Sequence, residues 1–211
     1  MKPSIARTPI PPDGLAGLPT VALLEENQGF LDQCMTSANG PPAWRNRKRA
    51  EARDLLALSQ ISTRLSVQYL DLREALRAVL LLRVPVARLT AEGTDLHIAQ
   101  HAVLGLTYIH AALREQLPGY AFLQILAPDC VWHANVAPDP VQPLCLGARL
   151  PAGIRVKELV LMAYGALSMQ TVMIDERDAA GVLNPMAAHW WQANIDRIPL
   201  SRAAFLSDAD D

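Results

Sequence analysis

The stretch APDCVWHANVAPDPVQPLCLGARLPAG, residues 127–153, separates two parts of the chain with different hydrophobic patterns and so decides the fold class. It contains Pro128, Pro138, Pro140, Pro143 and Pro151, and we expect it to be irregular. A long structureless stretch inside a compact domain is usually functional or disordered. Cys145 stands between two leucines, which favours anchoring of this segment against a hydrophobic core.

Short apolar segments precede the irregular stretch. Turn signals such as Glu92-Gly93 and Leu117-Pro118-Gly119 separate them. The pattern predicts an antiparallel four-stranded meander, although the third segment also fits a helix. The segments are residues 84–89, 96–100, 103–109 and 121–126.

The N-terminal part changes character near residue 44. Residues 1–43 are rich in proline and glycine, which predicts an arm with one short ordered piece at residues 21–26. Residues 44–58, WRNRKRAEARDLLAL, contain strong helix formers and no Gly or Pro, and they predict a basic amphipathic helix. Residues 69–82 carry leucines at near-helical spacing and allow a second helix.

Two helices are predicted after the irregular stretch. Residues 156–173 are apolar almost all round, as in a helix buried on several sides. The last helix is expected over residues 185–196, with Asn184 as its N-cap and Pro185 in its first turn. The order of elements predicts an α+β domain over residues 44–200, followed by an acidic tail, residues 201–211.

Composition limits the classes of function. The chain has 211 residues, of which 51% are hydrophobic, so it can bury a core. Its formal net charge of -2 gives no bulk electrostatic reason to expect a nucleic acid or an anionic membrane as partner. The most apolar run, residues 159–174, is interrupted by polar residues and is shorter than the roughly 20 apolar residues that a membrane span needs.

The cysteines and histidines exclude several kinds of site. Three cysteines without Cys-x-x-Cys spacing, and no visible secretory leader, favour a reducing, cytoplasmic setting. The histidines form no His-Glu-x-x-His motif, so no metal site is predicted. No Gly-rich phosphate loop is present, and we expect no nucleotide or other cofactor.

Two motifs in the irregular stretch resemble the ubiquitin-conjugating enzyme family and its divergent bacterial relatives. Trp132-His133-Ala134-Asn135-Val136 is similar to the His-Pro-Asn motif of that family, and Leu144-Cys145-Leu146 to its catalytic-cysteine motif. Asn184-Pro185-Met186-Ala187-Ala188 is similar to the start of the final helix. The resemblance covers residues 44–196. Ala134 replaces the proline, Asn135 lies further before Cys145 than is usual, and the tryptophan that follows the cysteine region is absent.

The resemblance implies a UBC-like fold, with a four-stranded meander flanked by an N-terminal helix and two C-terminal helices. It also implies a function in which a ubiquitin-like protein passes from an adenylating activating enzyme to Cys145 as a thioester and then to a target amine. Genes of the bacterial branch often lie in antiphage defence operons. By the resemblance, Asn135 supports the oxyanion or braces the active-site loop, and Asn184 flanks the incoming amine.

Each proposed role has a structural alternative. A cysteine between leucines is commonly a buried, inert small hydrophobe. His133 is better explained by loop structure than by general base catalysis, and Asn184 by helix capping. In the family the first helix helps to dock the activating enzyme, so we expect a partner surface there; a solvated helix face is the alternative. The residues of this basic cluster are Arg45, Arg47, Lys48, Arg49 and Arg53.

Three functions therefore stay open. The first is an active conjugating enzyme for a ubiquitin-like protein. The second is a catalytically silent module of the same fold that binds partners as a scaffold. The third is an interaction protein that acts through the arm and the basic helix.

Overall fold

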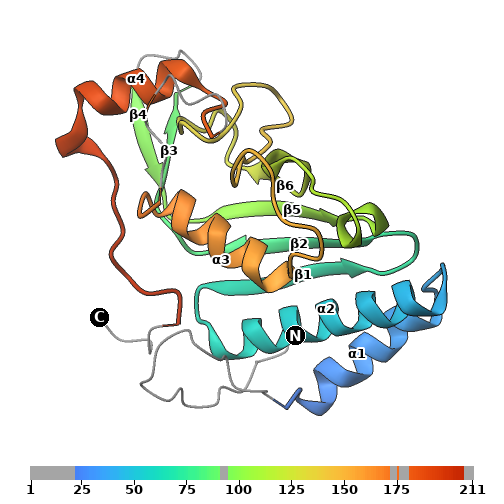
Figure 1. The fold of residues 1–211 in the computed structure, drawn as a ribbon. Helices are drawn as coiled ribbons and strands as arrows, with labels where there is room; N and C mark the ends of the chain where they lie inside the picture. Colours follow the sequence, from blue (N-terminus) through green and yellow to red (C-terminus); the bar gives the residue numbers. More distant parts are fainter. Residues whose placement is uncertain (1–21, 91–94, 172–174, 176–180, 207–211) are drawn as a thin grey trace.

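An antiparallel four-stranded sheet forms the centre of the computed structural model, which describes residues 22–90, 95–171, 175 and 181–206 (Figure 1). Its strand order is β1-β2-β5-β6. The strands are β1 (Leu65–Asp71), β2 (Leu76–Leu82), β5 (Ala102–Tyr108) and β6 (Leu123–Ala127). Alternate residues of β2 and β5 are buried, as the two-residue repeat of a sheet with one covered face requires. The predicted α+β class with a four-stranded antiparallel sheet is confirmed.

The membership of the sheet differs from the prediction. The first two predicted strands, now β3 (Val86–Leu89) and β4 (Leu96–Ala99), pair in a separate two-stranded sheet. Residues 69–82 are not a helix, because they hold the end of β1, a turn and all of β2. In this leucine-rich run the helical and strand periods overlap, and its pairing with β5 decides for a strand.

Helices cover the buried face and one edge of the sheet (Figure 1). Helix α2 (Pro42–Ile61) contains the predicted basic helix and packs against β1 and against α3 (Val156–Leu167). Helix α3 begins where predicted and ends at Leu167; residue 173 lies outside the described residues. Helix α4 (Pro185–Ala193) is followed by the 3-10 turn η3 (Ile195–Arg197). The other 3-10 turns are η1 (His110–Leu113) and η2 (Gly119–Ala121).

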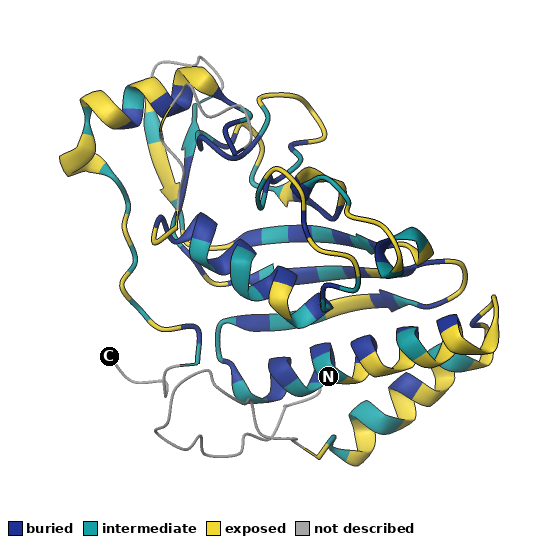
Figure 2. Cartoon of the chain, viewed as in Figure 1, coloured by how far each residue is buried: buried dark blue, intermediate teal, exposed yellow. Residues whose placement is uncertain are grey.

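The predicted N-terminal arm contains a helix, α1 (Glu25–Thr36). It lies along the outer side of α2, and Figure 2 shows its outward surface exposed while Leu31 is buried against the core. Buried Gln60 of α2 accepts hydrogen bonds from Leu24 N and from Asn27 Nδ2, at 3.3 and 2.7 Å. Two acidic residues in the first turn suit the positive end of the helix dipole.

The start of the predicted acidic tail is packed against the domain. Phe205 is buried, its ring lies edge-on to Tyr164 with centroids 5.1 Å apart, and its carbonyl accepts a hydrogen bond from Ser62 Oγ at 2.6 Å. Residues 201–206 therefore link α3 to the turn between α2 and β1. Residues 207–211 lie outside the described residues.

Candidate functional site

Asn135 and Cys145 lie directly opposite each other on two paired segments. We name these segments the asparagine limb, residues 131–137, and the cysteine limb, residues 142–147. Cys145 N donates to Asn135 O at 2.8 Å, and Ala137 N donates to Pro143 O at 3.1 Å. This pairing brings Asn135 and Cys145 together although they are ten residues apart in the sequence.

Both limbs are attached to regular structure. On the cysteine limb, Leu144 N donates to Leu123 O of β6 at 2.9 Å. The segment that opens the asparagine limb pairs with β3, because Leu89 N donates to Cys130 O and Trp132 N donates to Ala87 O, each at 2.9 Å. The separate β3–β4 hairpin thus holds the start of the asparagine limb.

His133 is a buried, neutral histidine whose ring connects the asparagine limb to α3 through hydrogen bonds. Asn135 N donates to its Nδ1 at 3.0 Å, so Nε2 carries the proton and donates to Ala166 O near the end of α3, also at 3.0 Å. Burial lowers the pKa of His133 to about 4, and the hydrogen bond to Ala166 opposes this only in part. Because both ring nitrogens have partners inside the protein, this histidine is not placed to act as a general base.

Asn135 and Asn184 meet through Ala134. Asn184 N donates to Ala134 O at 2.9 Å, while Asn135 Nδ2 donates to Gly181 O at 2.8 Å. Asn184 is the N-cap of α4, as predicted: its Oδ1 accepts from Ala187 N at 3.0 Å. No described residue pairs with Asn184 Nδ2, although the side chain is buried. The structure therefore brings the three predicted site residues into one linked cluster.

The Cys145 thiol is enclosed. The residue is 3% exposed, and its Sγ lies 3.4 Å from Gly147 O, which it meets as a donor. Gly147 has a φ of +136°, which suits glycine, and its carbonyl also accepts from Gly119 N at 3.0 Å. A side chain on Gly119 would place its Cβ 2.2 Å from that carbonyl, so η2 can approach the cysteine limb only with glycine there.

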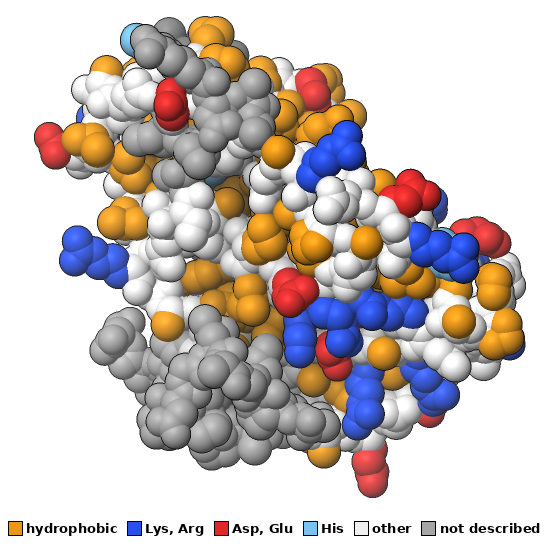
Figure 3. Space-filling model, viewed as in Figure 1, with side chains coloured by type: hydrophobic (Ala, Val, Ile, Leu, Met, Phe, Trp, Pro, Cys, Tyr) orange, Lys and Arg blue, Asp and Glu red, His pale blue; other side chains and the backbone are white. Residues whose placement is uncertain are grey.

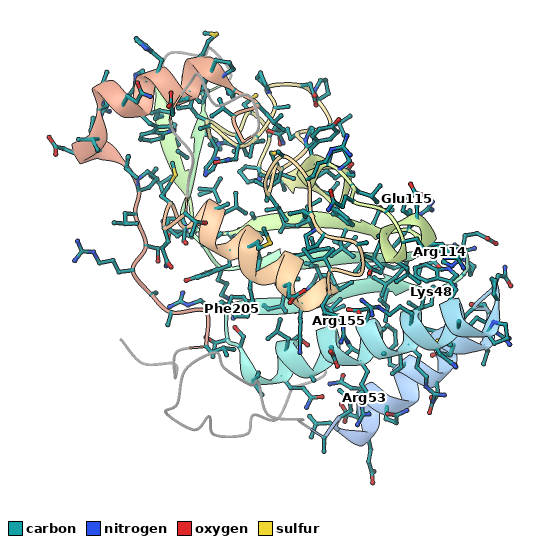
Figure 4. All side chains as sticks on the ribbon, viewed as in Figure 1. Lys48, Arg53, Arg114, Glu115, Arg155 and Phe205 are labelled. Atoms are coloured by element: carbon teal, nitrogen blue, oxygen red, sulfur yellow. The ribbon has the colours of Figure 1, made fainter. Side chains whose placement is uncertain are left out.

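The five residues of the basic cluster do not share one surface. Arg45, Arg49 and Arg53 are exposed, and Arg49 forms a surface ion pair with Asp32 of α1 at 2.5 Å. Lys48 faces inward, where its Nζ donates to the carbonyls of Asn39, Leu72 and Arg73. Lys48 therefore fixes the β1–β2 turn and is not available to a partner; Figure 4 labels it at this junction.

Arg47 takes part in a partly buried ion network around the buried Glu51 carboxylate, at the start of α3. Its Nε lies 2.8 Å from Glu51 Oε1, which also pairs with Arg155 Nε at 2.5 Å. Glu51 Oε2 accepts from Val156 N at 2.7 Å and so satisfies a free amide in the first turn of α3. Figure 3 shows Lys and Arg side chains gathered over α2 and the start of α3, which makes this face basic.

Other features of the described chain lie away from Cys145. A hollow of about 420 Å³ lies between α1 and β1, lined by residues that include Phe30, Cys34 and Tyr69. Among the described residues, no group of three or more His, Cys, Asp or Glu side chains is arranged to hold a metal ion. In the same part of the chain, every helix is too short or too polar to cross a membrane.

The sequence indicated Gly119 only as part of a turn. It gave no indication of a structural role for Gln142, which lies between Pro140 and Pro143 and contacts both limbs. Their roles depend on which segments meet in the fold.

The chain matches no family model, no curated protein and no solved structure.

Proposed function

We propose that the protein is a conjugating enzyme for a ubiquitin-like protein, with Cys145 as the residue that carries the transferred group. The observation that supports this most directly is the 2.8 Å hydrogen bond from Cys145 N to Asn135 O. It sets the candidate nucleophile beside the asparagine that the family resemblance assigns to acyl transfer. The order of elements around it, α2, an antiparallel sheet, the two limbs, α3 and α4, agrees with the order that the resemblance implies.

The proposed reaction has two acyl-transfer steps. The Cys145 thiol loses its proton, and its sulfur attacks the thioester that joins the ubiquitin-like C-terminus to the activating enzyme. A new sulfur–carbon bond forms on Cys145, and the thiolate of the activating enzyme leaves and takes up a proton. A target amine then attacks the Cys145 thioester, giving an amide and returning the Cys145 thiol.

The two asparagines have different places in this proposal. Asn135 braces the site, because its side chain holds Gly181 and its backbone holds Cys145. Asn184 caps α4 through its Oδ1, and its backbone N–H donates to Ala134 O, next to Asn135.

The partners follow from the resemblance. They are a ubiquitin-like protein and an adenylating activating enzyme, in the cytoplasm and in a bacterial antiphage defence pathway. The exposed basic residues Arg45, Arg49 and Arg53 on α2 are the part of the predicted docking surface that remains accessible.

Incubation with the activating enzyme, the ubiquitin-like protein and ATP tests the proposal. We expect an adduct that reducing agent removes, that is absent in Cys145→Ala, and that becomes resistant to reducing agent as an oxyester in Cys145→Ser. An adduct that persists in Cys145→Ala would place the chemistry elsewhere, and no adduct with the correct partners would exclude the enzyme.

A second candidate is the catalytically silent binding module of the same fold. The 3% exposure of Cys145 and the contact of its Sγ with Gly147 O favour it. This candidate requires that Cys145 resists a small alkylating reagent in the folded protein, both alone and with its partners. Rapid alkylation at Cys145 in the presence of the activating enzyme would exclude it.

A further inference from the structure

Gln142 has an unusual backbone for a side-chain-bearing residue. It lies between Pro140 and Pro143, at the start of the cysteine limb, with a φ of +48°. This left-handed conformation is uncommon for residues other than glycine, asparagine and aspartate. Such a conformation persists where the surrounding structure determines it, and it is enriched at functional sites.

The surroundings of Gln142 determine it through its side chain. Its Oε1 accepts from Val131 N at 2.8 Å, and its Nε2 donates to Ile125 O at 3.2 Å and to Pro128 O at 3.0 Å. The side chain is buried, with the residue 6% exposed. One amide group therefore connects the end of β6, the turn that follows it and the first residue of the asparagine limb.

The backbone of Gln142 is fixed as well. Its carbonyl accepts from Ile125 N at 2.9 Å, which registers the cysteine limb on β6. Its amide lies 2.8 Å from Asp139 Oδ1, as donor. The backbone of Gln142 thus belongs to the cysteine limb, while its side chain binds the first residue of the asparagine limb.

We infer that Gln142 is a positioning residue that sets the asparagine limb against the cysteine limb, and so places Asn135 beside Cys145. Val131 precedes His133 by two residues and Asn135 by four, and Gln142 precedes Cys145 by three. A rotation of either limb about its attachment to the sheet changes the pairing at Asn135 and Cys145. Gln142 bridges the limbs on the side opposite to β3, so the asparagine limb is held from both sides. The inference rests on the proposed function for its catalytic meaning, while its geometric content stands on these contacts.

The chain offers a matched control in Gln60. This glutamine is also buried and also makes three side-chain hydrogen bonds, to Leu24 N, Asn27 Nδ2 and Ala22 O. These bonds hold α1 to α2 and touch neither limb. Cys34 of α1, whose thiol donates to Leu70 O of β1, reports on the attachment of α1 to the rest of the domain, just as Cys145 reports on the limbs.

The test compares Gln142→Met with Gln60→Met in the full chain, each at the same interval below its melting temperature. Iodoacetamide labelling is followed separately at Cys145 and Cys34 by mass spectrometry, and an unstructured cysteine peptide added to each sample serves as the reference, because Cys130 lies next to Val131 and is itself affected by Gln142→Met. We expect Gln142→Met to raise the labelling rate of Cys145 by about tenfold and that of Cys34 by less than about twofold; Gln60→Met should do the reverse.

Equal effects of the two variants on Cys145, or no effect of Gln142→Met, would overturn the inference. If Gln142→Met does not fold, Gln142→Asn replaces it, because asparagine tolerates the left-handed backbone while its shorter side chain loses the bonds. Thioester formation by the unchanged protein is measured in parallel. The labelling crossover without any thioester would support the positioning role and exclude the proposed enzyme, whereas a thioester without the crossover would do the opposite.

Discussion

Protonation of buried His133 should make the protein less stable in acid. The pKa of this imidazole is about 4 in the folded protein, against an ordinary value of 6.5, because burial disfavours its charged form. Above pH 6.5 it is neutral in both the folded and the unfolded state and has no effect on stability. As the pH falls from 6.5 to 4, the unfolded chain binds a proton that the folded chain does not.

The magnitude follows from the two pKa values. Their separation corresponds to roughly 3 kcal/mol of unfolding free energy, lost progressively between pH 6.5 and pH 4. Below pH 4 both states are protonated, and the loss from this residue stops growing. Asp71 also contributes in acid, because the neighbouring Arg73 lowers the pKa of its carboxyl group and its stabilising effect is lost as the pH falls.

A variant without the titrating group isolates the histidine. Urea unfolding of the wild type and of His133→Gln at pH 7, 6, 5 and 4 gives the difference in free energy, in which the contribution of Asp71 cancels. We expect the wild type to lose about 3 kcal/mol more than the variant over this range. The pH dependence of the chemical shift of the imidazole protons, followed by NMR, measures the same pKa. An NMR titration midpoint near pH 6.5, or unfolding free energies of the two proteins that change in parallel with pH, would refute the assignment of His133 as a buried neutral residue.

Three further substitutions test individual contacts. Gly119→Ala should destabilise the protein by about 1–3 kcal/mol and speed the alkylation of Cys145, because the new Cβ meets Gly147 O. The control Gly29→Ala, with open space around it in α1, should instead stabilise the protein by about 0.5–1 kcal/mol. Equal effects of the two substitutions on stability would contradict this reasoning. Lys48→Met should cost about 3 kcal/mol in urea unfolding because buried carbonyls lose their donor, whereas Arg53→Met should stay within about 0.5 kcal/mol. Phe205→Ala should lower the unfolding free energy by about 3 kcal/mol, and a loss below about 1 kcal/mol would show that the ordered part of the tail is dispensable.

Local signals in the sequence determined several elements. The run of helix formers at residues 44–58 lies within α2, and the Asn184-Pro185 pair starts α4 with the expected cap. These predictions succeed because helix propensity and capping act over a few neighbouring residues. The location of β5 and β6 also follows from short apolar runs bounded by turn residues.

Tertiary structure decided how the strands pair. Residues 69–82 carry leucines that fit a helix, but pairing of β1 and β2 with each other, and of β2 with β5, makes them strands. Helix α1 is likewise stabilised by a side chain far away in sequence, that of Gln60, in addition to the acidic residues of its own first turn. No window of neighbouring residues contains these contacts, so no local pattern predicts them.

The candidate site divides in the same way. The sequence alone selected Cys145, Asn135 and Asn184, because their types and order resemble a known family. Only the tertiary structure placed Asn135 opposite Cys145, enclosed the thiol beside Gly147 and turned Lys48 inward. The physical reason is that each of these facts depends on hydrogen bonds between segments far apart in the sequence. Contacts with β3, β6 and α3 hold the two limbs, and the carbonyls of the β1–β2 turn hold Lys48. The irregular stretch from residue 127 to residue 153 contains Asn135 and Cys145 of the candidate site, and the elements around it determine the geometry of that site.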